Sequence, residues 1–144
     1  MLPDSAFPLL AALRGGTHEL HARTEAAFIL GDPARVTRDA YAGVLLRLAA
    51  YYAAAEAALA PWGPALTAHG VDLAARAKVP LVRRDLAALG VAVPDVGGPD
   101  RSPAPPAPAP DVPTAAHAFG VLYVLEGATL GGQLLRRRLG PALG

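Results

Sequence analysis

The chain has 144 residues, with 13 Lys and Arg, 12 Asp and Glu, and no cysteine. This length suffices for one domain with a hydrophobic core, so we expect a single domain over residues 1–144. A net charge of +1 argues against the basic surfaces that bind nucleic acid or anionic membranes. The absence of cysteine excludes disulfides and thiolate metal sites. The N-terminus lacks the basic start of a signal peptide, which favours a cytoplasmic protein.

The composition predicts an all-α fold. Hydrophobic residues make up 53% of the chain, and many of them are alanine, the strongest helix former. No segment alternates β-branched and polar residues as strands do, and no Asn-Gly or Asp-Gly hairpin signal is present.

The first two predicted helices lie before residue 61. The first begins at Asp4 or Ser5 and ends near Phe28, before Gly31-Asp32-Pro33. Thr37 is the expected N-cap of the second, which stops before Pro61. Two apolar stripes at helical spacing predict the core-facing sides: Leu10, Leu13, Leu20 and Phe28, with Thr17 and Thr24, and then Tyr41, Leu45, Leu48 and Tyr52.

The second half of the chain contains two further helical regions and a proline-rich connection. A helix over residues 71–89 should be kinked or interrupted at Pro80 and end at Gly90. Residues 94–113 hold eight of the 15 prolines, which predicts an extended surface loop or a docking segment at Pro103–Pro110. The last helix should run from Thr114 to about Leu139, with Arg136–Arg138 in its final turn before Gly140-Pro141.

The last helix is apolar enough to require comparison with a membrane span. Residues 115–135 include the pattern Gly127-x-x-x-Gly131, which also occurs in membrane helix dimers. However, Glu126 lies in the middle of this segment, and a carboxylate there is costly in hydrocarbon. We therefore expect a buried helix of a soluble protein and no membrane partner.

One face of the first helix carries polar residues at i, i+4, i+7 and i+11: Arg14, His18, His21 and Glu25. A neutral imidazole is a common axial ligand of haem iron, which makes His21 the candidate ligand. Glu25, one turn later, is placed to orient that imidazole. Arg14 and His18 are candidate partners of the haem propionates. The alternative is an ordinary solvated face of an amphipathic helix, and this helix alone does not decide between them.

The last helix presents glycines at Gly120, Gly127 and Gly131, with Gly132 beside them. Each helical glycine costs about 1 kcal/mol relative to alanine. Something should therefore approach this backbone closely, either another helix or a flat macrocycle. Glu126 should be paired, as a structural partner or an active-site acid, because an unpaired buried carboxylate is expensive. Together the two helices are typical of the two walls of a haem pocket.

The two segments resemble the haem oxygenase family, in particular its bacterial biliverdin-producing, phytochrome-associated branch. The pattern Leu-Arg-x-x-Thr-x-x-x-His-x-x-x-Glu matches residues 13–25, and Val36-Thr37-Arg38-Asp39-x-Tyr41 resembles the start of the next helix. The more specific pattern, Tyr-Val-x-Glu-Gly-x-x-Leu-Gly-Gly, matches residues 123–132.

The resemblance implies a haem oxygenase-like helical bundle in which His21 is the proximal, metal-binding residue and Glu25 its partner. It implies that Gly127 and Gly131 are the distal contacts of the catalytic site, and that Arg14 and His18 are basic propionate partners. We add Tyr123 and Arg136, on the last helix, as haem-binding candidates. The implied reaction cleaves haem, which is substrate and cofactor, to biliverdin, CO and Fe(II). It uses O2 and an external electron donor, either ferredoxin-like or a flavin reductase, and could supply chromophore to a bacterial phytochrome.

The sequence departs from the family at two places. Mammalian members have an aspartate after the first distal glycine, where this chain has Ala128 and where some bacterial relatives also lack it. Family members continue with further helices after the distal one, so we expect a C-terminally shortened form. Two other functions stay open: a haem-binding protein without turnover, and an all-α module whose glycines serve helix packing.

Overall fold

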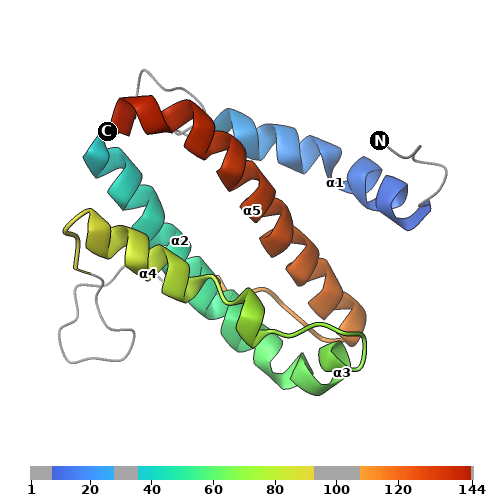
Figure 1. Cartoon of the computed structure of the whole chain (residues 1–144). Coiled ribbons are helices and arrows are strands. Elements are labelled where there is room, and N and C mark those ends of the chain that lie inside the picture. Colours follow the sequence, from blue (N-terminus) through green and yellow to red (C-terminus); the bar gives the residue numbers. More distant parts are fainter. Residues whose placement is uncertain (1–7, 28–35, 93–107, 144) are drawn as a thin grey trace. The chain divides into compact units, whose positions relative to one another are not determined.

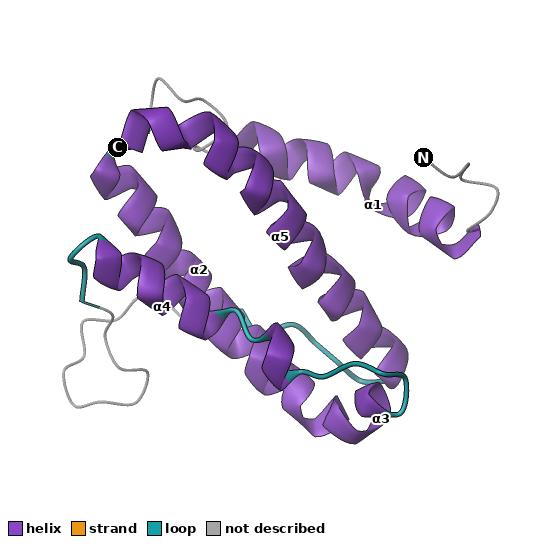
Figure 2. Cartoon of the chain, viewed as in Figure 1, coloured by secondary structure: helices purple, strands orange, loops and turns teal. Residues whose placement is uncertain are grey.

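The computed structural model describes residues 8–27, 36–92 and 108–143. These residues form helices and no strand, which confirms the predicted all-α fold (Figures 1 and 2). Contacts divide the chain into two compact units, Met1–Val36 and Thr37–Gly144. The single domain over residues 1–144 stays a prediction.

The first unit contains α1, Pro8–Ala27. Proline suits a first helical turn, where its missing N–H is not needed. No residue of α1 is buried, and Leu20 is 61% exposed. The hydroxyls of Thr17 and Thr24 donate to the carbonyls one turn earlier, each at 2.8 Å. The predicted caps Asp4 and Ser5, the predicted end at Phe28 and the Gly31-Asp32-Pro33 stop lie outside the described residues.

The second unit begins with α2, Arg38–Leu59, and its N-cap is Thr37 as predicted. The Thr37 hydroxyl accepts a hydrogen bond from the amide of Ala40 at 3.1 Å, and Asp39 lies in the first turn near the positive end of the helix dipole. The helix ends before Pro61, also as predicted. The chain then continues in a 3-10 turn, η4, Ala60–Trp62, and a short helix, α3, Gly63–Thr67.

Replacing this cap should destabilise the second unit. We expect Thr37→Ala to lower the free energy of unfolding by about 1 kcal/mol, because the Ala40 amide loses its acceptor. Urea denaturation monitored by circular dichroism measures the change. Thr37→Ser keeps the hydroxyl and should restore most of the stability; equal losses in both variants would show that the hydroxyl is not the cause.

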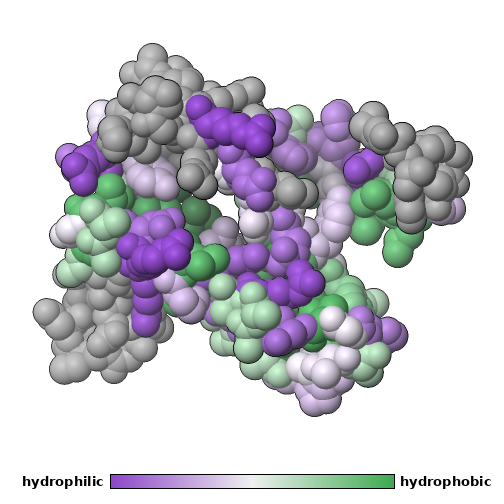
Figure 3. Space-filling model, viewed as in Figure 1, coloured by the Kyte–Doolittle hydropathy of each residue, from purple (hydrophilic) through white to green (hydrophobic). Residues whose placement is uncertain are grey.

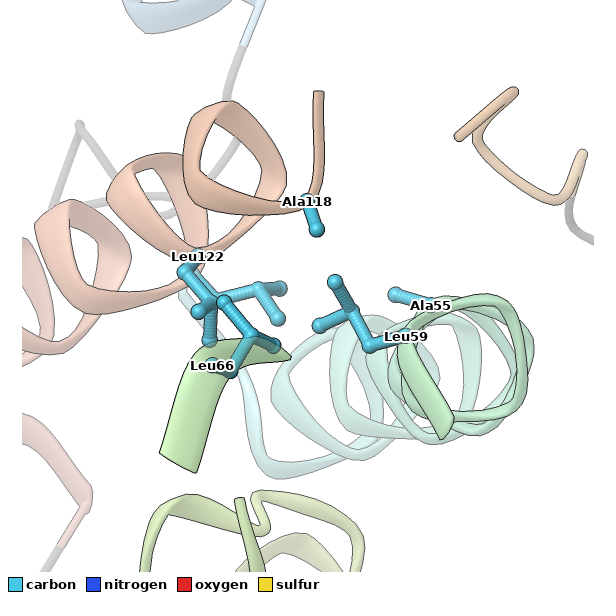
Figure 4. Packing of buried hydrophobic residues seen from close by; sticks show 6 residues of the cluster. Ala55, Leu59, Leu66, Ala118 and Leu122 are labelled. Atoms are coloured by element: carbon cyan, nitrogen blue, oxygen red, sulfur yellow. The ribbon is translucent and has the colours of Figure 1, made fainter. Parts of the chain in front are cut away.

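Two apolar clusters are described in the core of the second unit. In one, Leu45 and Ala49 of α2 pack against Val82 and Leu86, with Tyr41 and Tyr52 at its edge. The other joins the end of α2, α3 and the start of α5, as Figure 4 shows, and its buried members are Ala55, Leu59, Leu66, Ala118, Leu122 and Leu125. The predicted stripe of α2 is thus core-facing, although Leu48 is only partly buried.

The predicted helix over residues 71–89 is two separate elements. A 3-10 turn, η5, Ala74–Arg76, precedes α4, Val79–Ala88. The region is interrupted directly before Pro80, which lies in the first turn of α4, so the predicted interruption is observed and the alternative of a kink is not. Gly90, with φ of 72°, follows the helix in the left-handed region, which confirms the predicted stop.

The last helix, α5, spans Ala115–Leu143. Thr114 accepts a hydrogen bond from the amide of His117 at 3.4 Å, consistent with the predicted cap. The helix continues through Gly140-Pro141, so the predicted end near Leu139 is wrong, and Arg136–Arg138 do not lie in the final turn. Close to a helix end a proline removes only one backbone hydrogen bond, which the remaining turn tolerates.

The proline-rich connection is described only from residue 108. Residues 93–107 lie outside the described residues, so docking at Pro103–Pro110 stays a prediction. Val112 packs against the second core cluster, and its carbonyl accepts a hydrogen bond from the Trp62 indole at 3.0 Å. This end of the connection is therefore fixed to the core next to the start of α5.

Among the described residues, one helical stretch, Arg38–Thr67, is long and apolar enough to cross a membrane. A third of its most apolar window is buried inside the protein, and core helices of soluble proteins pass the same test. This is weak evidence for a membrane span.

Candidate functional site

The polar face of α1 holds the candidate iron ligand in an accessible position. His21 and Glu25 have side chains 67% and 73% exposed, and His21 Nδ1 lies 3.7 Å from Glu25 Oε1. Since 3.7 Å is beyond hydrogen-bond distance, the carboxylate is near the imidazole without bonding it directly. Arg14 and His18 lie on exposed positions of the same helix. The spacing thus puts a carboxylate beside the histidine, as the sequence predicts.

The second predicted wall is the glycine face of α5, defined here as Gly120, Gly127, Gly131 and Gly132. All four positions are exposed. A Cβ built on any of them would meet no described heavy atom within 4 Å. Packing of another described helix within the second unit therefore does not account for these glycines. The backbone is therefore exposed along this face, and the space that a larger residue's side chain would occupy is empty of described atoms.

Apolar side chains flank this open backbone. Figure 3 shows that apolar residues remain at the surface among polar ones. Among the described side chains of α5, the exposed large apolar ones are Phe119, Tyr123 and Val124 at 37%, 36% and 53%. Tyr123, a predicted haem-binding residue, also lines a shallow, open pocket with Val71, Arg76, Phe119, Leu122 and Glu126. The side chain of Arg136, the other added candidate, lies outside the described part of α5.

Glu126, directly before Gly127, is held by two cations. Lys78 Nζ donates to Glu126 Oε1 at 3.0 Å, and Arg76 Nη1 lies 3.5 Å from Oε2. The hydrogen bond from Lys78 and the two positive charges outweigh desolvation and lower the pKa of the Glu126 carboxyl. Glu126 is therefore paired, as the sequence analysis expects.

The partners of Glu126 are residues that sequence reasoning missed. Lys78 is the only lysine in the chain, but nothing in the sequence links it to Glu126. Its backbone is also fixed, because Glu56 Oε1 of α2 accepts hydrogen bonds from the amides of Lys78 and Val79 at 2.6 and 3.1 Å. A carboxylate of α2 thereby caps the start of α4 and places the lysine that reaches α5.

The lowered pKa of Glu126 makes stability depend on pH in the acid range. The ionised, paired carboxylate stabilises the folded state above the ordinary value of 4.5, and this contribution is lost as the pH falls through the lower folded value. Because the side chain is 39% exposed, solvent keeps the effect small. Below pH 4.5 we expect the urea midpoint of Glu126→Gln to fall less with decreasing pH than the midpoint of the parent protein. Parallel profiles for both proteins would contradict this assignment.

The other two histidines have structural contacts. His117 Nδ1 lies 2.7 Å from the Thr114 hydroxyl, and the His69 ring meets the edge of Phe119 with centroids 5.4 Å apart. These contacts agree with the sequence analysis, which gave neither histidine a chemical role. Among the histidines of the described residues, His21 and His18 therefore remain the candidates for haem chemistry.

Comparison with curated proteins finds a heme oxygenase of Xanthomonas campestris pv. campestris (strain 8004). It is 36% identical over 104 residues, which is 72% of this chain and 55% of the relative. The chain thus spans about half the length of the relative that it matches. No protein-family model matches, and no solved structure matches. The similarity, together with the all-α fold, supports the haem oxygenase family for this chain.

Proposed function

We propose that this chain is a haem oxygenase of the bacterial biliverdin-producing branch, with haem as substrate and cofactor. The observation that carries the proposal is the open glycine face of α5, whose backbone has no described neighbour within 4 Å of an added Cβ. A flat macrocycle needs such a face, and a helix rich in alanine would not present one. The accessible imidazole of His21 on α1 supplies the ligand chemistry that iron needs. The residues present therefore fit haem.

Each predicted residue then has a role. His21 ligates the iron, and Glu25 orients the imidazole from one turn away. Arg14 and His18 neutralise the propionates, while Tyr123 and Arg136 add contacts from α5. Gly127 and Gly131 let the helix backbone approach the substrate and leave space for O2. The bound haem, with O2 and electrons, supplies the oxidative chemistry that ends in biliverdin, CO and Fe(II).

The reaction requires a reductant, so we further propose a ferredoxin-like protein or a flavin reductase as electron donor. A cytoplasmic location suits both donors. The biliverdin would be available to a bacterial phytochrome as chromophore.

Turnover of haemin under air tests the proposal. Purified protein is mixed with haemin, ferredoxin, ferredoxin reductase and NADPH, and biliverdin is quantified by chromatography and CO by trapping with ferrous myoglobin. Biliverdin and CO in equal amounts are the expected result. A haem complex that stays intact would instead favour a haem-binding protein without turnover, for which Ala128, in place of the mammalian aspartate, is the specific observation. A His21→Ala sample is the control for uncatalysed haem degradation.

A further inference from the structure

We propose that Glu126 is a positioning residue: its ion pair with Lys78 fixes α5 against the start of α4 and so determines where the backbone of Gly127 and Gly131 lies. The consequence for haem rests on the proposed function, whereas the consequence for α5 itself does not.

The position of Glu126 along α5 gives it this role. The buried side chains described on α5 are Ala118, Leu122 and Leu125, and all of them precede Glu126. After it, the described positions 127–129 and 131–133 are exposed. Glu126 is therefore the last described position of α5 that is not exposed, and the glycine positions 127, 131 and 132 come after it.

The direction of the contact matters as much as its place. Apolar packing determines which face of α5 is turned to the core, but the hydrophobic effect itself requires no defined geometry between two groups. A hydrogen-bonded ion pair requires a defined donor and acceptor geometry. The 3.0 Å bond from Lys78 to Glu126 thus fixes the rotation of the helix one residue before Gly127.

The other end of the bond is itself held firmly. The Lys78 side chain is only 12% exposed, and its own amide donates to Glu56 of α2 at 2.6 Å. A chain of contacts therefore runs from Glu56 through Lys78 to Glu126. Arg76 adds a second, longer contact at 3.5 Å, so removal of Lys78 alone should loosen α5 less than removal of the Glu126 charge.

Hydrogen exchange of the haem-free protein tests the consequence for α5. The variants are Glu126→Gln, Lys78→Met and the double variant, with Asp85→Asn as control because it also removes one carboxylate, on α4 beside Arg84. We expect amides of residues 127–133 to exchange about threefold or more faster in Glu126→Gln, with a smaller increase in Lys78→Met. The amides of residues 45–49 should keep their protection in every variant. The double variant should exchange no faster than Glu126→Gln, since both changes remove the same ion pair.

The outcomes separate positioning from general stability. Faster exchange confined to residues 127–133, absent from Asp85→Asn, supports the proposal. An equal increase in α2 and α5, or none in α5, overturns it. If Glu126→Gln does not fold, Lys78→Met carries the same test, because it retains the Arg76 contact.

A second measurement tests whether the Lys78–Glu126 ion pair affects haem turnover. In Glu126→Gln the dissociation constant for haemin should change less than threefold, because the His21 ligand is untouched, while kcat falls about tenfold as the distal backbone loses its place. Loss of haem affinity with kcat unchanged would contradict a positioning role. Failure of the parent protein to bind haem would reject the proposed function and leave the exchange experiment to decide on α5.

Discussion

His21→Ala should abolish axial ligation of haem iron. Loss of a residue that only hydrogen-bonds to a metal ligand typically weakens metal binding about 10–100-fold. Loss of the ligand itself should therefore weaken haemin binding by about 100-fold or more. The side chain is 67% exposed on α1, so its removal leaves no buried cavity and folding should be unaffected. Optical titration with haemin measures the affinity and the Soret band together.

His18→Ala is the matched control, three residues earlier on the same helix. It should weaken binding moderately, through the lost propionate contact, and keep the Soret spectrum of an imidazole complex. External imidazole should restore the parent spectrum in His21→Ala and have little effect in His18→Ala. A parent-like spectrum in His21→Ala without added imidazole would disprove the ligand assignment.

Filling the glycine face should stabilise the haem-free protein and impair haem binding. Gly127→Ala with Gly131→Ala adds two methyl groups that meet no described atom within 4 Å. Each substitution should raise the free energy of unfolding by up to about 1 kcal/mol, because alanine is the better helix former. The same methyl groups would separate the backbone from the macrocycle, and turnover should fall about tenfold or more. Urea denaturation and haemin turnover on the same samples measure both effects.

Gly43→Ala on α2 is the control for this pair. Its added Cβ would meet only the end of the flexible Arg47 side chain, at 3.8 Å, so a similar gain in stability is expected. Haem binding and turnover should be unchanged in this variant. A double glycine variant of α5 with parent turnover would contradict the assignment of this face to haem.

Local signals in the sequence predicted most of the helices. The Thr37 cap, the end of α2 before Pro61 and the stop at Gly90 depend on residues within one turn, and the structure confirms all three. Two positions that the local signals left undecided or misplaced involve proline: Pro80 starts α4 after an interruption, and Pro141 lies within α5. Proline allows either a helix break or a first turn, and the choice depends on what the neighbouring segment packs against.

Only part of the candidate site could be predicted from the sequence. The i, i+4 spacing of His21 and Glu25 is a property of the helix alone, and the structure keeps them 3.7 Å apart. The partner of Glu126 is 48 residues away in sequence. Helical periodicity carries no information about such a pair, because it forms only once α4 and α5 pack on α2. The requirement that Glu126 be paired followed from its apolar surroundings, but the identity of the cation did not.

The most direct test of the central claim is an optical titration of the purified chain with haemin, with His21→Ala alongside. If this claim holds, the parent protein forms a saturable one-to-one complex with a sharp Soret band, which is lost in the variant and restored by imidazole. No saturable Soret shift in a protein that remains helical by circular dichroism would contradict it.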